Sequence, residues 1–224
     1  LYHSNSFVVA NFGQDSSFAG NKTAQGKTDA SGLGDFYYTA PTGYKALCSR
    51  NLPLTSPSII RPQKHFDTLL WTGNGGTQTI SGLEFSPGLV WVKIRSQGYN
   101  HQLIDTVRGA TKRLQSNQTT EEKTNTNGLT AFTDDGFTVG DQNNLNKSSD
   151  TFVGWCWKAG GAAVANTDGT LNSQVSVNEE AGFSIVTYTG TNANGATVGD
   201  GLGKGPKWYM IKRLDSTGYW MVYH

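Results

Sequence analysis

The sequence predicts an all-β protein, made of antiparallel β-sandwich modules in tandem. Glycine is frequent, with 28 of 224 residues, whereas only 16% of residues are charged and 36% are hydrophobic. Such a composition is typical of short strands joined by many turns. Apolar residues alternate or come in short runs such as LVWVKI, FVGWCW and FSIVTY, a pattern of strands and not of helices. The third observation is an internal repeat.

The repeat links FDTLLWTGNGGTQTISGL, which begins at Phe66, to FSIVTYTGTNANGATVGDGL, which begins at Phe183. The two phenylalanines are 117 residues apart, and Lys93 and Lys212, further along the two copies, are 119 apart. Each copy continues through an aromatic-rich strand that ends in lysine to a polar turn containing Gly-Tyr. A unit that recurs after more than a hundred residues indicates a duplicated domain.

Five segments are therefore expected along the chain. Residues 1–52 are interpreted as the C-terminal part of a sandwich and 53–65 as a linker, because its prolines remove ladder donors and stiffen the chain. Residues 66–160 form the first complete β-sandwich. A linker or small hairpin over 161–182 leads to residues 183–224, the start of a second, incomplete copy of the 66–160 module.

Strands are predicted within the complete module from its alternating and short apolar runs. They cover residues 67–72, 89–94, 102–105, 130–132, 136–139 and 151–157. Asp135-Gly136 predicts a hairpin in which the glycine supplies the positive φ of a primed turn. Strands of this number pack as two stacked antiparallel sheets.

Shorter elements are expected outside the complete module. Two short strands are predicted in NSFVVANFGQDSSFAG near the N-terminus, and a further strand in residues 34–53. The pair Asp168-Gly169 predicts a small hairpin in the connector that precedes the second copy.

A family resemblance rests on three motifs of the complete module. LIDTVRGATKRL, DGFTVG and WCWKAGG together resemble a repeated domain of structural proteins from marine tailed phages, notably those of cyanobacteria. The resemblance covers residues 66–161 and resumes at 182–224. It implies a concanavalin A-like jelly-roll fold and a place on the virion surface, in a tail fibre or head-attached appendage.

The segment before the linker carries a second resemblance. VVANFGQDSSFA and FYYTAPTGYKALCSRNLP are similar to the C-terminal end of a SPRY-like sandwich. Together the resemblances imply several sandwiches in tandem, assembled as a homo-oligomer, with a trimer expected, and in contact with other virion proteins. Domains of this kind usually bind partners or host-surface glycans and carry out no chemistry.

Charge and hydropathy argue against other partners. The net charge is +1, and the densest basic run, Arg108–Arg113, is short. Phosphate binding needs a concentrated basic face, so nucleic acid is not expected. No run of eighteen apolar residues occurs, so membrane insertion is not expected. The two cysteines, Cys48 and Cys156, do not make a disulfide scaffold; a bridge between them stays open, and Cys156 is expected to be a buried thiol.

Enzymatic activity is not expected, and no cofactor or metal is assigned. The sequence has no G-x-S-x-G elbow and no H-E-x-x-H motif. The pairs Glu121-Glu122 and Glu179-Glu180 are adjacent, so their side chains point to opposite faces of a strand and cannot form the paired carboxyls of a glycosidase. The run DQNNLN, residues 141–146, has one carboxylate among its oxygens, so a solvated loop is preferred to a calcium site.

Glycan contact is the binding function that the sequence supports best. Aromatic rings stack on pyranose faces while amide and imidazole groups bind the hydroxyls. Tyr99, Asn100 and His101 have this composition at a predicted loop tip, and Tyr219 and Trp220 occupy the same place in the second copy. The alternative is that Tyr99 caps the sandwich core.

Other prominent residues are assigned structural roles. Asp105 and Arg108 are expected to form a salt bridge that holds a turn. The tryptophans at positions 71, 91, 155 and 157 alternate within strands and are expected in the core or between modules. A secreted microbial glycan-binding or glycan-cleaving protein is the alternative function, and a purely architectural fibre subunit is another.

Overall fold

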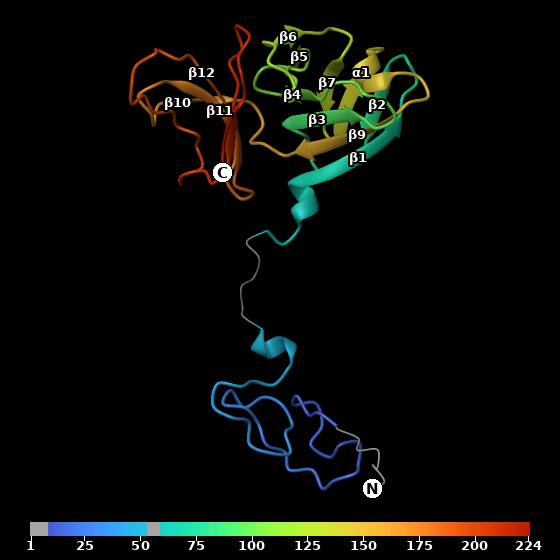
Figure 1. Ribbon diagram of the computed structural model, residues 1–224, viewed down its shortest axis with the longest axis vertical. Coiled ribbons are helices and arrows are strands. Elements are labelled where there is room, and N and C mark those ends of the chain that lie inside the picture. The colour runs from blue at the N-terminus through green and yellow to red at the C-terminus, as the bar shows by residue number, and fades with distance from the viewer. Residues whose placement is uncertain (1–8, 53–58) are drawn as a thin grey trace, which may run out of the picture. The chain divides into compact units, whose positions relative to one another are not determined.

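The computed structural model describes residues 9–52 and 59–224 (Figure 1). The chain divides into two compact units, Leu1–Pro57 and Ser58–His224. The start of the predicted N-terminal strand, and most of the predicted linker prolines, lie outside the described residues.

The described part of the first unit, residues 9–52, consists mainly of turns. It contains one isolated antiparallel bridge, between Lys27 and Phe36, and the 3₁₀ helix η1 (Ser49–Asn51). The strands predicted from the sequence in this region are wrong for the described residues. The reason is local, because Asp, Asn and Ser side chains bind the backbone groups that a sheet would use.

Asp29 shows this competition most clearly. Its buried carboxylate accepts hydrogen bonds from the backbone N–H groups of Ser31, Leu33 and Ala46, at 2.8–3.0 Å. The bonds from Ala46 and Leu33 contribute most to lowering the pKa of Asp29 to about 2. Three backbone donors are thus held by one carboxylate, which fixes this region as a set of turns.

Nearly all regular elements of the second unit are strands. Its elements are η2 (Pro62–Lys64), β1 (Phe66–Thr72), β2 (Gln78–Ser81), β3 (Leu89–Ile94), β4 (Gln102–Asp105), β5 (Lys112–Arg113), β6 (Lys123–Thr124), β7 (Leu129–Thr133), β8 (Gly136–Val139), α1 (Asn143–Asn146), β9 (Thr151–Trp157), β10 (Val164–Asn166), β11 (Ser173–Asn178), β12 (Phe183–Tyr188), β13 (Tyr209–Ile211) and β14 (Met221–Tyr223). All six strands predicted in the complete module are present. The connector before the second copy forms a hairpin, β10–β11, whose second strand pairs with β12.

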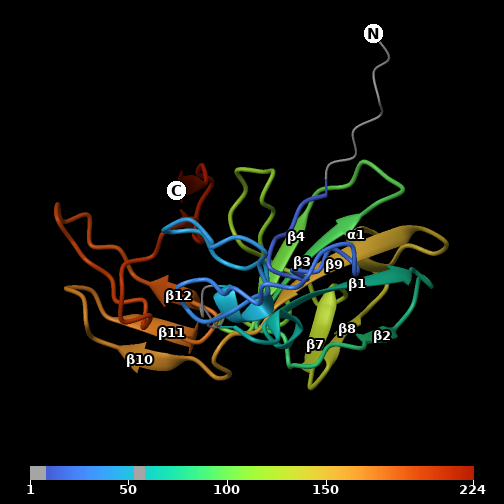
Figure 2. The same cartoon turned by 90° about the horizontal axis from the view of Figure 1, so that it is seen from below.

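Two stacked antiparallel sheets form the body of the unit. The first has the order β1-β9-β3-β4 and the second the order β2-β8-β7. Figure 2 shows β2, β7 and β8 beneath the layer of β1, β9 and β3. The predicted all-β sandwich is therefore confirmed.

The core lies between these two sheets and follows the period-2 alternation of the strands. In β3 the buried positions are Val90, Val92 and Ile94, and in β9 they include Phe152. Phe137 on β8 faces them and is fully buried. Alternate side chains thus point inward on both layers, and the sequence pattern is a direct consequence.

β9 occupies the centre of the larger sheet, because it pairs with β1 on one edge and β3 on the other. Its inward position Gly154 leaves room for the ring of Trp71, which stacks on Phe152 at 5.3 Å and meets Phe137 edge-on at 5.6 Å. A Cβ on Gly154 would lie 3.2 Å from the Trp71 ring. The predicted core role of Trp71 is confirmed.

The other three tryptophans lie on the outer face of the same sheet and are half-buried. Trp91 packs against Trp155 and Trp157, at ring-centroid distances of 6.2 and 6.5 Å. Trp157 also stacks on Phe183, the first residue of β12, at 6.2 Å. The outer tryptophans therefore join the first module, residues 66–160, to the strands that follow.

The hairpins β3–β4 and β13–β14 have the same register. Trp91 lies opposite Leu103 in the first, and Met210 lies opposite Val222 in the second. Corresponding residues are 119 positions apart in both strands, the spacing that the sequence gives for Lys93 and Lys212. These two lysines each donate a hydrogen bond to the carbonyl of the next residue.

The structure decides three expectations: the solvated loop at residues 141–146, the open question of a bridge between the two cysteines, and the burial of the Cys156 thiol. The DQNNLN run is not a solvated loop, because it contains α1, and Asn146 is fully buried with its amide near the carbonyls of Gly76 and Gly140. Both cysteines are free. Burial raises the pKa of the Cys156 thiol to about 12, as expected for a buried, unreactive group.

The hairpin at Asp135-Gly136 forms, but the reason for the glycine differs from the prediction. Gly136 is not among the residues with positive φ. It starts β8 beside β2, and a Cβ there would lie only 1.9 Å from the carbonyl oxygen of Ile80. Close approach of two backbones, and not turn geometry, requires the glycine.

We expect Gly136→Ala to lower the free energy of unfolding by more than about 2 kcal/mol, because β2 and β8 must separate to admit the methyl group. Urea denaturation followed by tryptophan fluorescence measures this. Gly98→Ala is the matched control, since Gly98 has open space around it, and its effect should be within about 0.5 kcal/mol. Equal effects of the two changes would contradict the assignment.

Candidate functional site

The predicted site residues of the first module lie in the loop between β3 and β4. The side-chain oxygen of Asn100 accepts hydrogen bonds from the amides of Asn117, at 2.9 Å, and Gln118, at 3.2 Å. The backbone N–H of His101 donates to the side-chain oxygen of Asn117, at 3.1 Å. These contacts gather three amide side chains at one edge of the sandwich.

His101 is held as a neutral acceptor. The indole N–H of Trp91 donates to His101 Nδ1 at 2.8 Å. Burial, with a smaller contribution from the charge of Lys93, lowers the pKa of His101 below its ordinary value. The imidazole is therefore uncharged at neutral pH, and its position depends on the outer tryptophan.

Tyr99 has a mixed role. Its ring packs partly against the hydrophobic core, and the ammonium group of Lys147 lies 5.7 Å from the ring centroid. This is the core-capping position that the sequence left open as the alternative. Tyr99 is half-buried, so part of the residue is accessible to solvent.

The predicted residues of the second copy lie close to the same edge, through residues 115–119. The indole N–H of Trp220 donates to the carbonyl of Gln115 at 3.0 Å, and the N–H of Gly218 donates to the carbonyl of Thr119 at 2.9 Å. Tyr219 between them is 82% exposed. The segment 115–119 therefore connects the two predicted groups of residues.

Sequence analysis missed this connecting segment. Asn117 and Gln118 contact Asn100 directly, and Gln115 anchors Trp220. One sequence feature could have indicated it: the polar run SNQTT, residues 116–120, has a composition similar to that of the predicted loop tip at residues 99–101. We call the set Asn100, Asn117, Gln118, Tyr219 and Trp220 the amide-aromatic edge.

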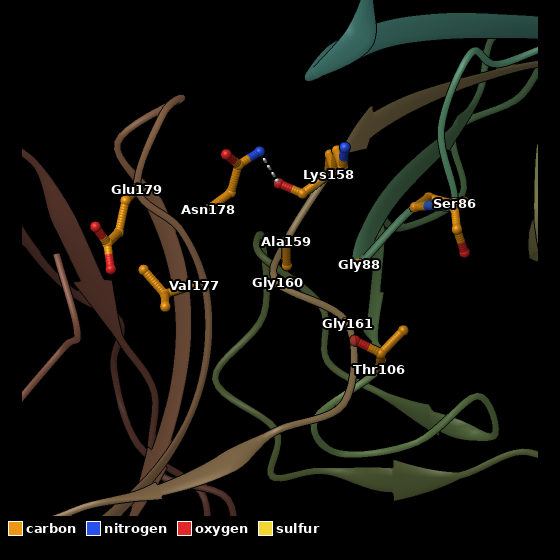
Figure 3. Close-up of a pocket in the computed structure, with 11 residues that line it drawn as sticks. Ser86, Gly88, Thr106, Lys158, Ala159, Gly160, Gly161, Val177, Asn178 and Glu179 are labelled. Atoms are coloured by element: carbon orange, nitrogen blue, oxygen red, sulfur yellow. Dashed lines mark hydrogen bonds between the residues drawn. The ribbon is translucent and has the colours of Figure 1, made fainter.

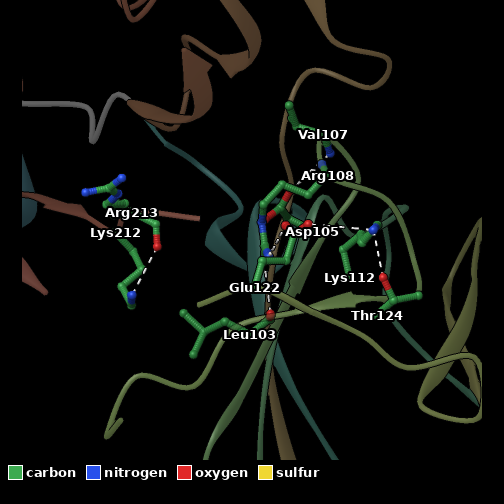
Figure 4. Close-up of polar contacts among 9 residues, drawn as sticks. All are labelled: Leu103, Asp105, Val107, Arg108, Lys112, Glu122, Thr124, Lys212 and Arg213. Atoms are coloured by element: carbon green, nitrogen blue, oxygen red, sulfur yellow. Dashed lines mark hydrogen bonds and ion pairs between the residues drawn. The ribbon is translucent and has the colours of Figure 1, made fainter. Parts of the chain in front are cut away.

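A buried ion-pair network surrounds Arg108 (Figure 4) and includes Glu122, three residues after the segment 115–119. Arg108 donates to Asp105 Oδ2 at 2.6 Å, to Glu122 at 3.2 Å and to the carbonyl of Leu103 at 3.1 Å. The backbone N–H of Glu122 in turn donates to the carbonyl of Leu214. The predicted Asp105–Arg108 salt bridge is confirmed, and it fixes the segment on which the edge is built.

An open cleft lies at a different place, where the end of β9 meets β11 (Figure 3). Asn178 donates to the carbonyl of Lys158 at 3.2 Å, and Ser176 Oγ bridges the N–H of Gly160 and the carbonyl of Gly161. These bonds use the polar groups of the cleft to join the two strands. The cleft is therefore the junction between two parts of the same unit, and we assign no ligand to it.

Among the residues that the structure describes, no group of three or more His, Cys, Asp or Glu side chains is placed to hold a metal ion. In the same part of the chain, no helix has the length and apolar character needed to cross a membrane.

Comparison with known proteins identifies one family. The family described as Domain of unknown function (DUF7483) matches residues 61–224, most of the chain. The chain belongs to this family. No curated protein and no solved structure matches it. The matched range includes both hairpins and the whole amide-aromatic edge, so the edge is part of a single family domain.

The groups on the edge are of kinds that can bind hydroxyls. Carboxamides both donate and accept hydrogen bonds without charge. An exposed aromatic ring offers an apolar face of the size of a pyranose. Amides and a ring on one edge can therefore bind a neutral, polyhydroxylated surface.

We expect Arg108→Ala to lower the free energy of unfolding by about 3–5 kcal/mol, because it leaves the buried carboxylate of Asp105 unpaired. The control is Arg213→Ala, since the Arg213–Asp215 pair is at the surface and exposed pairs contribute at most about 1 kcal/mol. Urea denaturation of both variants is the measurement. A loss below about 1 kcal/mol for Arg108→Ala would show that the network does not support the fold.

Proposed function

We propose that this chain is part of a tailed-phage virion, in a tail fibre or a head-attached appendage, and that it adheres to glycans on the host surface. It acts as a structural binding module and not as an enzyme. The protein works as a homo-oligomer, with a trimer as the expected state, beside other virion proteins on the particle surface.

The observation that carries this proposal is the common register of β3–β4 and β13–β14 at 119 residues. It supports the view that the two hairpins are repeats of one concanavalin A-like module. Repetition of sandwich modules suits a fibre, which must extend from a particle while presenting the same surface several times. The phage-like motifs of the first module point the same way.

The amide-aromatic edge supports the adhesive part of the proposal. The amides of Asn100, Asn117 and Gln118 are uncharged and are held together by hydrogen bonds among themselves, and Tyr219 offers an exposed ring. Both hairpins contribute to the edge, so a longer array would present it repeatedly. Weak binding at each edge would then add up through multivalency.

Two other functions remain as alternatives. A secreted microbial protein that binds or cleaves glycans would use the same edge, and carboxyl groups paired across one sheet face would favour cleavage. A purely architectural subunit would use its sandwiches only to contact one another.

Immunogold labelling of phage particles with antibodies against residues 59–224 tests the virion assignment. Particles without label, and label on secreted material, would overturn it.

We expect Tyr219→Ala to weaken binding to host surface polysaccharide about five- to tenfold, because one stacking surface is lost. Surface plasmon resonance on immobilised polysaccharide from a susceptible host measures this. Leu70→Ala is the matched control, because Leu70 is an exposed apolar residue on β1, outside the edge, and its affinity should not change. Equal affinities for all three proteins would exclude the edge as the binding surface.

A further inference from the structure

The strands β13 and β14, and Tyr188 at the end of β12, carry apolar side chains that are exposed, although their equivalents in the first module are buried. At the common spacing of 119 residues, Tyr209 corresponds to Val90, Ile211 to Val92, Met221 to Gln102 and Tyr223 to Ile104. The four first-module residues are at most 1% exposed, whereas those of β13 and β14 are 40–65% exposed. The same positions thus have opposite environments.

These exposed residues share one face of the hairpin. The rings of Tyr209 and Tyr223, which lie opposite each other, stack at 5.1 Å with an interplanar angle of 17°. Alternation places Ile211 on the same side as Tyr209, and Met221 on the same side as Tyr223. The result is a continuous apolar patch, of a kind that normally has a partner.

The first module shows what covers the equivalent face. β9 pairs with β1 and β3 together, and Phe152 of β9 and Phe137 of β8 fill the space beneath. Covering the face therefore involves both a central strand and a second layer. Residues 129–157 provide both.

Within the described residues 59–224, no strand corresponding to β9 lies between β12 and β13. Between residues 59 and 224, β12 pairs only with β11, and β13 pairs only with β14, in two separate sheets. Each strand thus has one edge without a sheet partner. Tyr188 of β12, at the place of Trp71 in the first copy, is 42% exposed, whereas Trp71 is 8% exposed.

We infer that β12, β13 and β14 form a receptor for a polypeptide segment of the kind that residues 129–157 provide in the first module. A strand with the pattern of β9 pairs with β12 on one side and β13 on the other. Strand edges with free N–H and C=O groups select an extended polypeptide over a lipid or small molecule.

The residue pattern of this occupant follows from β9. Its inward positions are Phe152, Gly154 and Cys156, and none of the seven strand residues is charged. In the receptor, the inward glycine faces the Tyr188 ring, as Gly154 faces Trp71. A charged inward residue would be placed against Tyr209 and Ile211 without a counter-ion, which excludes acidic and basic strands.

The test is to extend residues 1–224 after His224 by a second copy of residues 106–158 and to measure amide hydrogen exchange. His224 corresponds to Asp105 at the common spacing, so the added segment continues in register. We expect the amides of β12 and β13 to exchange at least about 100-fold more slowly than in the unextended chain. A folded extended chain with unchanged exchange would overturn the inference.

Two controls separate pairing from a general effect of added sequence. In the first, the appended copy carries Phe152→Asp, which should abolish the protection. In the second, Ile211→Asp should leave the unfolding midpoint of the unextended chain unchanged but remove the protection in the extended one. Val164→Ser, at an exposed position on β10, should retain it.

If the extended protein does not fold, a second test is available. A synthetic peptide of residues 129–158 is added to the unextended chain, and the exchange of the β12 and β13 amides is measured again. Saturable protection of β12 and β13 supports the inference, and no protection at the highest soluble concentration overturns it. Sedimentation of the unextended chain gives the remaining outcome. A dimer in which these amides are already protected would make a second copy the occupant and would also overturn the inference.

Discussion

The pairing of β9 on both of its edges is the interaction on which the second unit depends. It joins β1 to β3, although β1 ends at Thr72 and β3 begins only at Leu89, and it supplies side chains to both faces. The inward glycine admits Trp71 to the core. The outward Trp157 stacks on Phe183 and so attaches the next set of strands. A single strand thus closes the sandwich and connects it to the strands that follow.

The same hairpin register occurs twice, once inside a buried core and once at the surface. The comparison therefore separates the contribution of backbone pairing from that of core burial. Backbone pairing in β13–β14 follows the pattern of β3–β4 without a buried core around it. Polar contacts hold this hairpin in place instead, through Trp220 to Gln115 and Leu214 to Glu122. The amide-aromatic edge exists because these contacts bring the two hairpins to one segment.

Much of the larger module could be predicted from the sequence, because its strands bury alternate residues and therefore carry a period-2 signal. The core position of Trp71 and the Asp105–Arg108 pair followed from the same local patterns. The reason for Gly136 could not be predicted, since it depends on the distant carbonyl of Ile80. The turns of residues 9–52 were missed because side-chain carboxylates there replace strand partners.

The candidate site was only half predictable. Tyr99 and Tyr219 could be proposed from composition at loop tips, but Asn117 joins them through contacts across the fold that no local pattern reveals. Cross-strand nuclear Overhauser effects test the equivalence of the two hairpins most directly, and this equivalence underlies both the candidate site and the proposed function. It predicts contacts between Met210 and Val222, matching those between Trp91 and Leu103. Contacts shifted by one residue, with Met210 opposite Met221, would contradict it.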